Sequence, residues 1–265
     1  MKIINKYVEN IKTKYVDAEK EDGRLIRSRH GQLEFFTTNT YIHKYLKKGM
    51  RILELGAGTG RYSISLAKEG YDVTAVELMK SNFKLLKKNA KGIKNICTFQ
   101  GDALDLSSFK DNEFDMVLVL GPMYHLFEEQ DKVQVIKESI RVAKNNATII
   151  YAFLTTASIV FGWGLCGNLK TLKSEFNDDY TLKELPKEVF TAYDVDKFEK
   201  LFLKFNVKKL HTVSADSVVD ISENNEKFNV DDEDFEILKE YHLATCERKD
   251  MLGISNHILF ICKKL

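Results

Sequence analysis

The middle of the chain alternates between short apolar runs and segments whose apolar residues recur with helical spacing. Apolar runs of strand length occupy residues 50–55, 72–77, 96–100, 114–120, 147–155, 206–214 and 257–263. Helical patterns separate most of them, at residues 60–69, 81–90, 132–143 and 194–205. Regular alternation of this kind builds right-handed crossovers and a parallel sheet. The pattern therefore predicts an α/β fold of the Rossmann-like, doubly wound type, with helices on both faces of the sheet.

Three segments lie outside this alternation. Residues 1–48 are expected to form a mostly helical lead-in or cap before a main domain at residues 49–265. Residues 156–192 are long for a connection between a strand and a helix, so we expect a lid insertion there. A last helical pattern at residues 231–249 opens with the acidic run Asp231-Asp-Glu-Asp. Negative charge is favoured at a helix N-terminus, so capping explains these acids better than a functional patch does.

The segment 147–169 contains no charged residue and approaches the length of a membrane span. It also contains three glycines and the polar pair Thr155-Thr156, and its first half fits a buried central strand of a parallel sheet. The N-terminus mixes charged and apolar residues and lacks the apolar core of a signal peptide. We therefore expect a cytoplasmic protein that does not bind membranes, with a membrane segment at residues 147–169 as the alternative.

Charge and cysteine content limit the classes of ligand. Lys and Arg number 40 and Asp and Glu number 39, so no global basic field favours nucleic acid. A solvated helix face explains six clustered lysines better than a nucleic-acid surface does: Lys80, Lys84, Lys87, Lys88, Lys91 and Lys94. The four cysteines form no Cys-x-x-Cys pair and have no histidine at metal-ligand spacing: Cys97, Cys166, Cys246 and Cys262. We expect core cysteines in a reducing compartment, no metal and no nucleic-acid partner.

The sharpest motif is the glycine loop in Arg51-Ile-Leu-Glu-Leu-Gly-Ala-Gly-Thr-Gly-Arg61, where an apolar strand runs into Gly56, Gly58 and Gly60 and then a helix. Glycines allow a tight turn and let a ligand approach the main chain, here around Ala57. A dinucleotide fingerprint needs glycine where Arg61 stands, so that a diphosphate can sit on the helix N-terminus. Glu54 is also the wrong group beside a diphosphate. Its carboxylate suits the ammonium and sulfonium end of S-adenosylmethionine.

Two further acids follow the next two strands. The second strand ends in Ala75-Val-Glu77, where a carboxylate can accept from both ribose hydroxyls, with Leu78 next to it. The third strand is followed by Gly101-Asp102-Ala103, where Asp102 can accept from an adenine amino group and the Ala103 amide can donate to a ring nitrogen. Acids at strand ends are common loop residues individually. Three acids at the ends of three successive strands predict that an adenosine group binds at this edge of the sheet. Leu120, at the end of the fourth strand, is expected to line the same site.

With these residues in place, the sequence resembles the class I S-adenosylmethionine-dependent methyltransferases, of a bacterial small-molecule type. The resemblance covers about residues 50–155, through the glycine motif, Glu77, Gly101-Asp-Ala103 and the fourth-strand run 114–121. It implies a seven-stranded, mostly parallel sheet with an antiparallel last strand. It also implies S-adenosylmethionine as cofactor and S-adenosylhomocysteine as product. The turn before strand five departs from the family pattern, with Lys144-Asn-Asn-Ala147, but asparagine tolerates a left-handed turn.

Candidate catalytic residues follow the fourth strand. Tyr124 and His125 come after Gly121-Pro122 and are expected over the cofactor. His125 is the candidate general base, because imidazole titrates near neutral pH; a contact to the ligand and a structural role remain open. Tyr124 is expected to supply shape and one hydroxyl.

Other candidate groups lie in the lead-in and the insertion. Arg29 can pair with the methionine carboxylate of the cofactor, or it is a surface arginine. Glu34 is either an acid that contacts the substrate or a group on a helix surface, and we expect the helix surface. Three aromatic residues of the insertion either line an apolar acceptor pocket or form the core of the insertion: Phe161, Trp163 and Tyr180.

The function predicted from these features is methyl transfer from S-adenosylmethionine to a small-molecule acceptor. A methyltransferase acting on protein or RNA ranks second, because no Asn/Asp-Pro-Pro-Tyr motif follows the fourth strand. A non-catalytic S-adenosylmethionine-binding regulator and a nicotinamide oxidoreductase are the remaining alternatives. The acceptor and the oligomeric state are not specified by the sequence.

Overall fold

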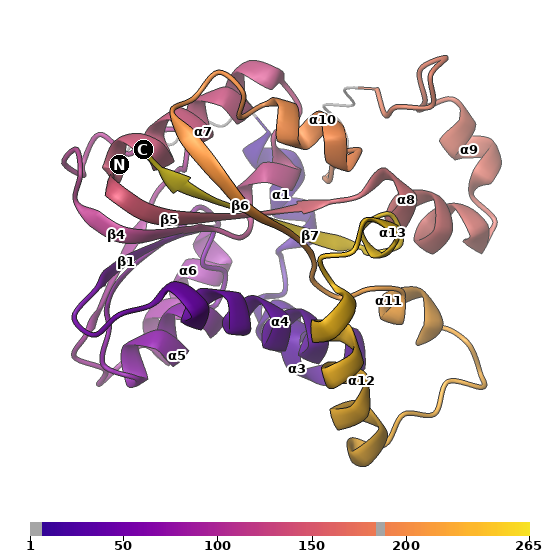
Figure 1. Cartoon of the computed structure of the whole chain (residues 1–265), viewed down its shortest axis with the longest axis horizontal. Coiled ribbons are helices and arrows are strands. Elements are labelled where there is room, and N and C mark those ends of the chain that lie inside the picture. The colour runs from indigo at the N-terminus through magenta and orange to yellow at the C-terminus, as the bar shows by residue number, and fades with distance from the viewer. Residues whose placement is uncertain (1–6, 184–188) are drawn as a thin grey trace.

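The computed structural model describes residues 7–183 and 189–265, and its centre is one seven-stranded sheet (Figure 1). The strands are β1 (Arg51–Leu55), β2 (Asp72–Glu77), β3 (Ile96–Gln100), β4 (Phe114–Val119), β5 (Ala143–Leu154), β6 (Val207–Ser214) and β7 (His257–Lys264). Their order is β3-β2-β1-β4-β5-β7-β6, and β7 runs antiparallel to both of its neighbours. The predicted fold class, with an antiparallel last strand, is confirmed.

Helices cover both faces of this sheet because side chains of each buried strand alternate between two apolar layers. The layer that contains Ile52, Met116 and Ile150 packs against α4 (Arg29–Tyr45) and α5 (Arg61–Lys68). The opposite layer, which contains Leu53, Val117 and Tyr151, packs against α7 (Glu129–Val142) and α10 (Val195–Lys200). Figure 1 shows these two helix pairs on opposite sides of the sheet. A further helix, α6 (Lys80–Asn89), follows β2.

The turn at residues 144–147, which departs from the family pattern, lies at the start of β5. Its pairing with β4 jumps from Phe114–Ala143 to Met116–Thr148, so the residues between form a bulge. Asn146 lies in this bulge with a φ of 67°, the left-handed conformation that the sequence allowed. The strand therefore begins four residues earlier than the apolar pattern predicts.

The lead-in consists of α1 (Val8–Lys14), α2 (Ala18–Asp22), α3 (Arg24–Arg27) and α4. Side chains set where two of these helices begin. Asp17 accepts hydrogen bonds from the amides of Glu19 and Lys20, and Ser28 accepts one from Gly31. The chain therefore turns between short helices, and this path brings α1 to α3 over one edge of the sheet.

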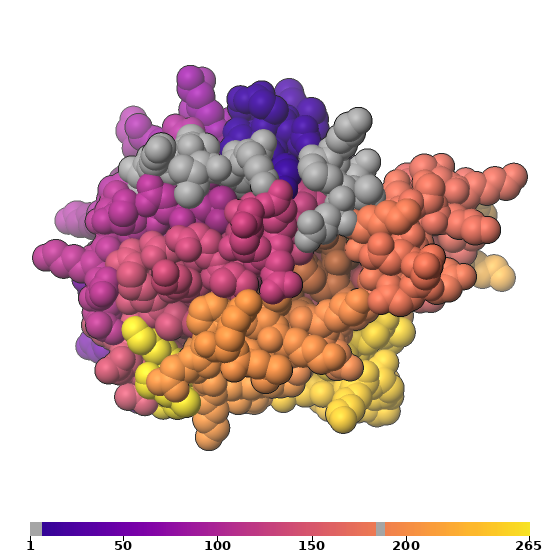
Figure 2. All heavy atoms as spheres, turned by 90° about the horizontal axis from the view of Figure 1, so that it is seen from above, coloured from indigo at the N-terminus to yellow at the C-terminus, as the bar shows by residue number. Residues whose placement is uncertain are grey.

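The segment after β5 forms α8 (Thr156–Ser158), η2 (Ile159–Trp163), η3 (Gly164–Cys166) and α9 (Leu169–Lys173). Seen from above in Figure 2, this segment projects from the rest of the molecule. The uncharged stretch 147–169 is thus divided between a buried strand and short exposed helices. Within residues 7–183 and 189–265, no helix combines the length and apolar character needed to cross a bilayer. Residues 184–188 of the predicted lid lie outside the described residues.

Between β6 and β7 the chain forms α11 (Val219–Ser222), α12 (Asp232–Thr245) and α13 (Lys249–Leu252). Asp231 caps α12 by accepting from the amide of Asp234, as its position suggested. The single helix predicted at 231–249 is wrong at its end, because extended backbone at Arg248 separates α12 from α13.

The cysteines only partly match their expected core positions. All four are free, and Cys246 and Cys262 are buried. Cys97 and Cys166 are exposed, because β3 is an edge strand and η3 belongs to the projecting insertion.

Candidate functional site

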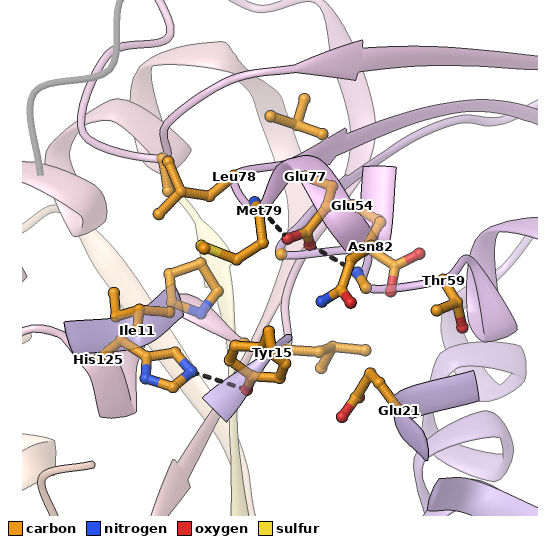
Figure 3. Close-up of a pocket in the computed structure, with 18 of the residues that line it drawn as sticks. Ile11, Tyr15, Glu21, Glu54, Thr59, Glu77, Leu78, Met79, Asn82 and His125 are labelled. Carbon is orange, nitrogen blue, oxygen red and sulfur yellow. Dashed lines mark hydrogen bonds between the residues drawn. The ribbon is translucent and has the colours of Figure 1, made fainter. Parts of the chain in front are cut away.

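One cavity lies at the carboxyl edge of the parallel strands, under the lead-in. Its volume is about 960 Å³ with its open mouth included. The strand side is lined by the glycine loop and the acids at the ends of β1, β2 and β3, and the lead-in side by residues of the segment from α1 to α3. Figure 3 shows Glu54 and Glu77 on one side and Tyr15 and Glu21 on the other. Ligands of α/β sheets bind at this edge of the sheet.

The glycine loop is shaped by close contact with the chain after β4. Gly56 has a φ of 74°, and a Cβ built on it would lie 2.8 Å from Pro122 Cδ. Its amide and that of Ala57 both donate to the Val76 carbonyl, at 2.9 and 3.0 Å. The loop is thereby fixed against β2, with Gly56, Ala57 and Gly58 lining the cavity. Gly60, predicted to touch the cofactor, instead caps α5 with a φ of 97° and faces Leu86 and Ile64.

Glu77 connects the end of β2 to the glycine loop. Its carboxylate accepts from the Gly58 amide at 2.8 Å and from the Met79 amide at 2.7 Å (Figure 3). Burial raises the pKa of Glu77 to about 7, although both amide hydrogen bonds oppose the shift. Each oxygen keeps a second lone-pair direction, so the group can still accept from a ligand hydroxyl.

Glu54 lies at the end of β1 and is also buried in the cavity wall. The Ser63 hydroxyl of α5 donates to one of its oxygens. Burial raises its pKa to about 7 as well, with the Ser63 hydrogen bond acting in the opposite direction. A buried carboxylate of this kind is stabilised when a cationic group of a ligand binds beside it.

The turn after β3 completes the strand side. Asp102 is buried, lines the cavity with Gly101 and Ala103, and accepts from the Leu104 amide at 3.1 Å. The Gly101 amide donates to the Glu77 carbonyl at 3.0 Å, which holds this turn next to the end of β2. Leu78 and Leu120 line the same cavity.

Arg29 does not lie where the sequence suggested. Its guanidinium donates to the Val230 carbonyl, Gln32 and Asp232, and it stacks over Phe235. These contacts hold the start of α4 against α12, away from the cavity. The arginine that lines the cavity from the lead-in is Arg24.

Arg24 belongs to a buried network of charges. It binds Glu34 through two hydrogen bonds of 2.6 and 3.0 Å and approaches Glu21 at 3.3 Å. Glu34 is therefore buried, and its expected place on a helix surface is wrong. Burial would raise the pKa of Glu34, but Arg24 and His257 outweigh it and hold the pKa at about 2.

The network continues to the start of β7. His257 Nδ1 lies 2.7 Å from Asp216 and 3.6 Å from Glu34, so the three residues place ligand-type atoms within 4.8 Å of one another. Protein groups already bind them, however. Arg24 takes both oxygens of Glu34, and Asp216 accepts from His257 and from two backbone amides. The cluster is an ion-pair network that joins the lead-in to the sheet.

His125 and Tyr124 both line the cavity from the short helix η1 (Pro122–His125). His125 Nδ1 lies 2.8 Å from the Val189 carbonyl, and Nε2 lies 3.0 Å from the Tyr15 hydroxyl. Burial lowers the pKa of His125 to about 4. The Tyr124 hydroxyl donates to the Leu120 carbonyl at 2.9 Å, and burial raises its pKa. Both ring nitrogens of His125 are hydrogen-bonded within the protein, so neither is free to take a proton from a ligand. The Tyr124 hydroxyl is likewise hydrogen-bonded and stays protonated.

The lead-in, rather than the insertion, covers the cavity. Ile11, Tyr15, Glu21 and Leu25 line it, whereas none of the described residues of 156–192 does. Phe161 and Trp163 are 47% and 44% exposed and Tyr180 is 76% exposed, so they form neither a cavity wall nor a core. The sequence did not identify Tyr15, Glu21 and Arg24 as cavity residues. Their place in the lead-in was the only feature that set them apart.

Comparisons with known proteins agree with this geometry. Residues 52–146 match a family model described as a methyltransferase domain. Glycine/sarcosine N-methyltransferase of Parasynechococcus marenigrum is 33% identical over 101 residues, which are 37% of this chain and 36% of that enzyme. Demethylmenaquinone methyltransferase of Staphylococcus carnosus is 29% identical over 144 residues, 53% of this chain and 56% of that enzyme. The matches thus span between about a third and just over half of these curated relatives.

Solved structures extend the likeness to the whole fold. A SAM dependent methyltransferase from Aquifex aeolicus superposes with a TM-score of 0.56 at 16% identity, over 94% of this chain and 99% of that chain. Such a likeness shows the fold. Residues 52–146 thus match a methyltransferase domain, and the whole chain has the Rossmann-like fold of a solved S-adenosylmethionine-dependent methyltransferase, with three acids around one cavity.

Proposed function

We propose that the protein transfers the methyl group of S-adenosylmethionine to a small-molecule acceptor. The observation that carries this proposal is one cavity that the acids at the ends of β1, β2 and β3 share and that the lead-in covers. An acceptor must fit between the lead-in and η1, which favours a small molecule over a protein or RNA segment. The names of the relatives, glycine/sarcosine N-methyltransferase and demethylmenaquinone methyltransferase, support the same class.

The cavity residues fit the parts of S-adenosylmethionine one by one. Glu77 would hold the ribose hydroxyls, and Asp102 with the Ala103 amide the adenine. Glu54 would hold the ammonium group, and Gly56 to Gly58 allow the main chain to approach. Arg24 takes the place expected for Arg29 beside the carboxylate, since a guanidinium has five N–H donors and Glu21 and Glu34 use only some of them.

When bound, the cofactor supplies an activated methyl group on a positively charged sulfur. The chain then has to align the acceptor, exclude water and accept a proton where the acceptor carries one. Ile11, Leu25 and Tyr15 of the lead-in exclude water from above. His125 acts through Tyr15, whose hydroxyl it orients, and is a positioning residue in this proposal.

Affinity for S-adenosylhomocysteine is expected to fall as the pH drops below 7. Burial raises the pKa of Glu54 and of Glu77 to about 7, so both acids gain protons below that pH. A bound ammonium group favours the ionised form, so binding below pH 7 must release a proton. The affinity for S-adenosylhomocysteine falls by up to about tenfold per pH unit for each of the two carboxyl groups. Calorimetry from pH 5 to 9 in buffers of different ionisation enthalpy measures it. A constant affinity without proton release contradicts the assignment.

Methyl transfer is tested by supplying the full-length protein with labelled S-adenosylmethionine and cell extract divided by size. Label in the low-molecular-weight fraction, with release of S-adenosylhomocysteine, is the expected result. Label in protein or RNA would replace the small-molecule acceptor by a macromolecule. Tight cofactor binding without any transfer would indicate a regulator.

A further inference from the structure

The direction of the Tyr15 hydroxyl is fixed by two hydrogen bonds in series. A carbonyl oxygen can only accept, so His125 Nδ1, 2.8 Å from the Val189 carbonyl, carries the hydrogen. The buried ring is neutral near pH 7, and its Nε2 then accepts. The Tyr15 hydroxyl, 3.0 Å away, therefore donates to His125. Its oxygen presents only lone pairs to the cavity.

Most other donors on this wall bond within the protein. The Tyr124 hydroxyl donates to the Leu120 carbonyl at 2.9 Å. Arg24 directs one N–H of each terminal nitrogen to Glu34 and its Nε toward Glu21, and its two remaining N–H groups are assigned above to the cofactor carboxylate. The wall formed by the lead-in and η1 is therefore rich in hydrogen-bond acceptors.

Glu21 adds a carboxylate to the same wall. It lines the cavity from α2, and its side chain is 23% exposed. A Cβ built on Gly58 would lie 3.8 Å from its Oε1, so the Glu21 carboxylate lies close to the glycine loop. Burial raises its pKa, although Arg24 acts in the opposite direction. A raised pKa makes the carboxylate a stronger base.

We propose that the methyl acceptor is a primary or secondary amine that binds between the Tyr15 oxygen and the Glu21 carboxylate. This inference rests on the function proposed above. The ammonium form of a primary or secondary amine has at least two N–H donors and satisfies both groups at once. An alcohol has one donor, a thiol has one weak donor, and a carbon acceptor has none. Each of these would leave the Tyr15 oxygen or the Glu21 carboxylate without a hydrogen bond to the acceptor, which lowers the affinity.

The chemistry balances with the residues present. The amine enters as an ammonium ion, and the Glu21 carboxylate removes one proton from nitrogen. The nitrogen lone pair forms a bond to the methyl carbon while the carbon–sulfur bond breaks, and its electron pair stays on sulfur. The product is a methylated ammonium ion, and the proton on Glu21 is lost to solvent.

The inference is tested on full-length protein saturated with S-adenosylhomocysteine. Matched amines, alcohols and thiols on several scaffolds, such as benzylamine, benzyl alcohol and benzyl mercaptan, are titrated by calorimetry. We expect amines to bind at least about tenfold more tightly than their matched alcohols and thiols, the ratio for one hydrogen bond to a charged group. Glu21→Gln and Tyr15→Phe should each reduce this preference. Glu19→Gln, on the exposed side of α2, and Tyr180→Phe, on the insertion, are the matched controls.

The outcomes separate this inference from the proposed function. Alcohols or thiols that bind as well as their amines, or amines that do not bind the complex at all, overturn the amine assignment. An amine preference that survives both Glu21→Gln and Tyr15→Phe also overturns it. Failure of S-adenosylhomocysteine itself to bind contradicts the proposed function instead.

Discussion

We expect Glu34→Ala to lower the free energy of unfolding by roughly 3 kcal/mol, because it leaves the Arg24 guanidinium without its main partner. Both Arg24–Glu34 hydrogen bonds would be lost, and the Arg24 side chain is only 31% exposed. His257 would also lose a neighbouring negative charge. The melting temperature should fall by about 6–12 °C in a chain of this size.

Glu236→Ala is the matched control, because Glu236 forms an exposed ion pair with Lys239 on α12. Its loss should cost less than about 1 kcal/mol. Acid titration gives a second measure. The pKa of Glu34 is lowered from 4.5 to about 2, so its contribution is complete above pH 4.5 and is lost as the pH falls toward 2. Equal stability losses in both variants, or an unchanged acid profile in Glu34→Ala, would show that the network does not stabilise the fold.

Gly56→Ala should weaken S-adenosylhomocysteine binding by about a hundredfold. A φ of 74° strains any L side chain, and the new Cβ would lie 2.8 Å from Pro122 Cδ and 3.1 Å from the Gly121 backbone. Neither neighbour is a flexible side-chain end, so the glycine loop has to move. This movement separates the Gly58 amide from Glu77 and displaces the main chain from the ligand. Two lost contacts of about 1–3 kcal/mol each account for the expected factor.

Gly49→Ala separates backbone strain from steric clash. Gly49 has a similar φ of 83°, but a Cβ there would meet no atom within 4 Å. Both variants should lose about 1 kcal/mol of stability through strain, while only Gly56→Ala loses affinity. Calorimetry and thermal unfolding on both proteins measure the two effects. Normal affinity in Gly56→Ala would mean that the loop does not form the ligand site.

The sheet and the three acids could be predicted from the sequence because both follow from local patterns. Buried parallel strands appear as continuous apolar runs, and their carboxyl ends meet at one edge. Glu54 and Glu77 lie at the ends of such runs and Asp102 follows one, so the register of the strands brings them together. Gly60 shows the limit of motif reading. It belongs to the same motif but serves the packing of α5 against α6.

The lead-in side could not be predicted in the same way. Arg24 and Arg29 stand five residues apart in a similar composition, and only the break at Ser28 between α3 and α4 decides which one reaches the cavity. Tyr15 reaches His125 through tertiary contacts that no periodicity marks. Glu34 did carry a signal. It precedes Thr37, Thr38, Tyr41 and Ile42 by three, four, seven and eight residues, so helical spacing places it on the buried face of α4.

The insertion was predicted as a lid from its length alone. Length shows that a segment lies outside the sheet, but the direction in which it projects depends on packing. Here Thr155 bonds to Ser255 and Thr156 to Tyr193, so the chain leaves β5 beside β7 rather than over the cavity.

The central claim is that this cavity binds S-adenosylmethionine rather than a dinucleotide, and calorimetric titration with S-adenosylhomocysteine tests it most directly, with NADH as the comparison. We predict saturable binding of S-adenosylhomocysteine, weakened in Glu77→Ala and Asp102→Ala by roughly 1–3 kcal/mol each, and no binding of NADH. Binding of NADH alone, or S-adenosylhomocysteine affinity that is unchanged in both variants, would contradict the account.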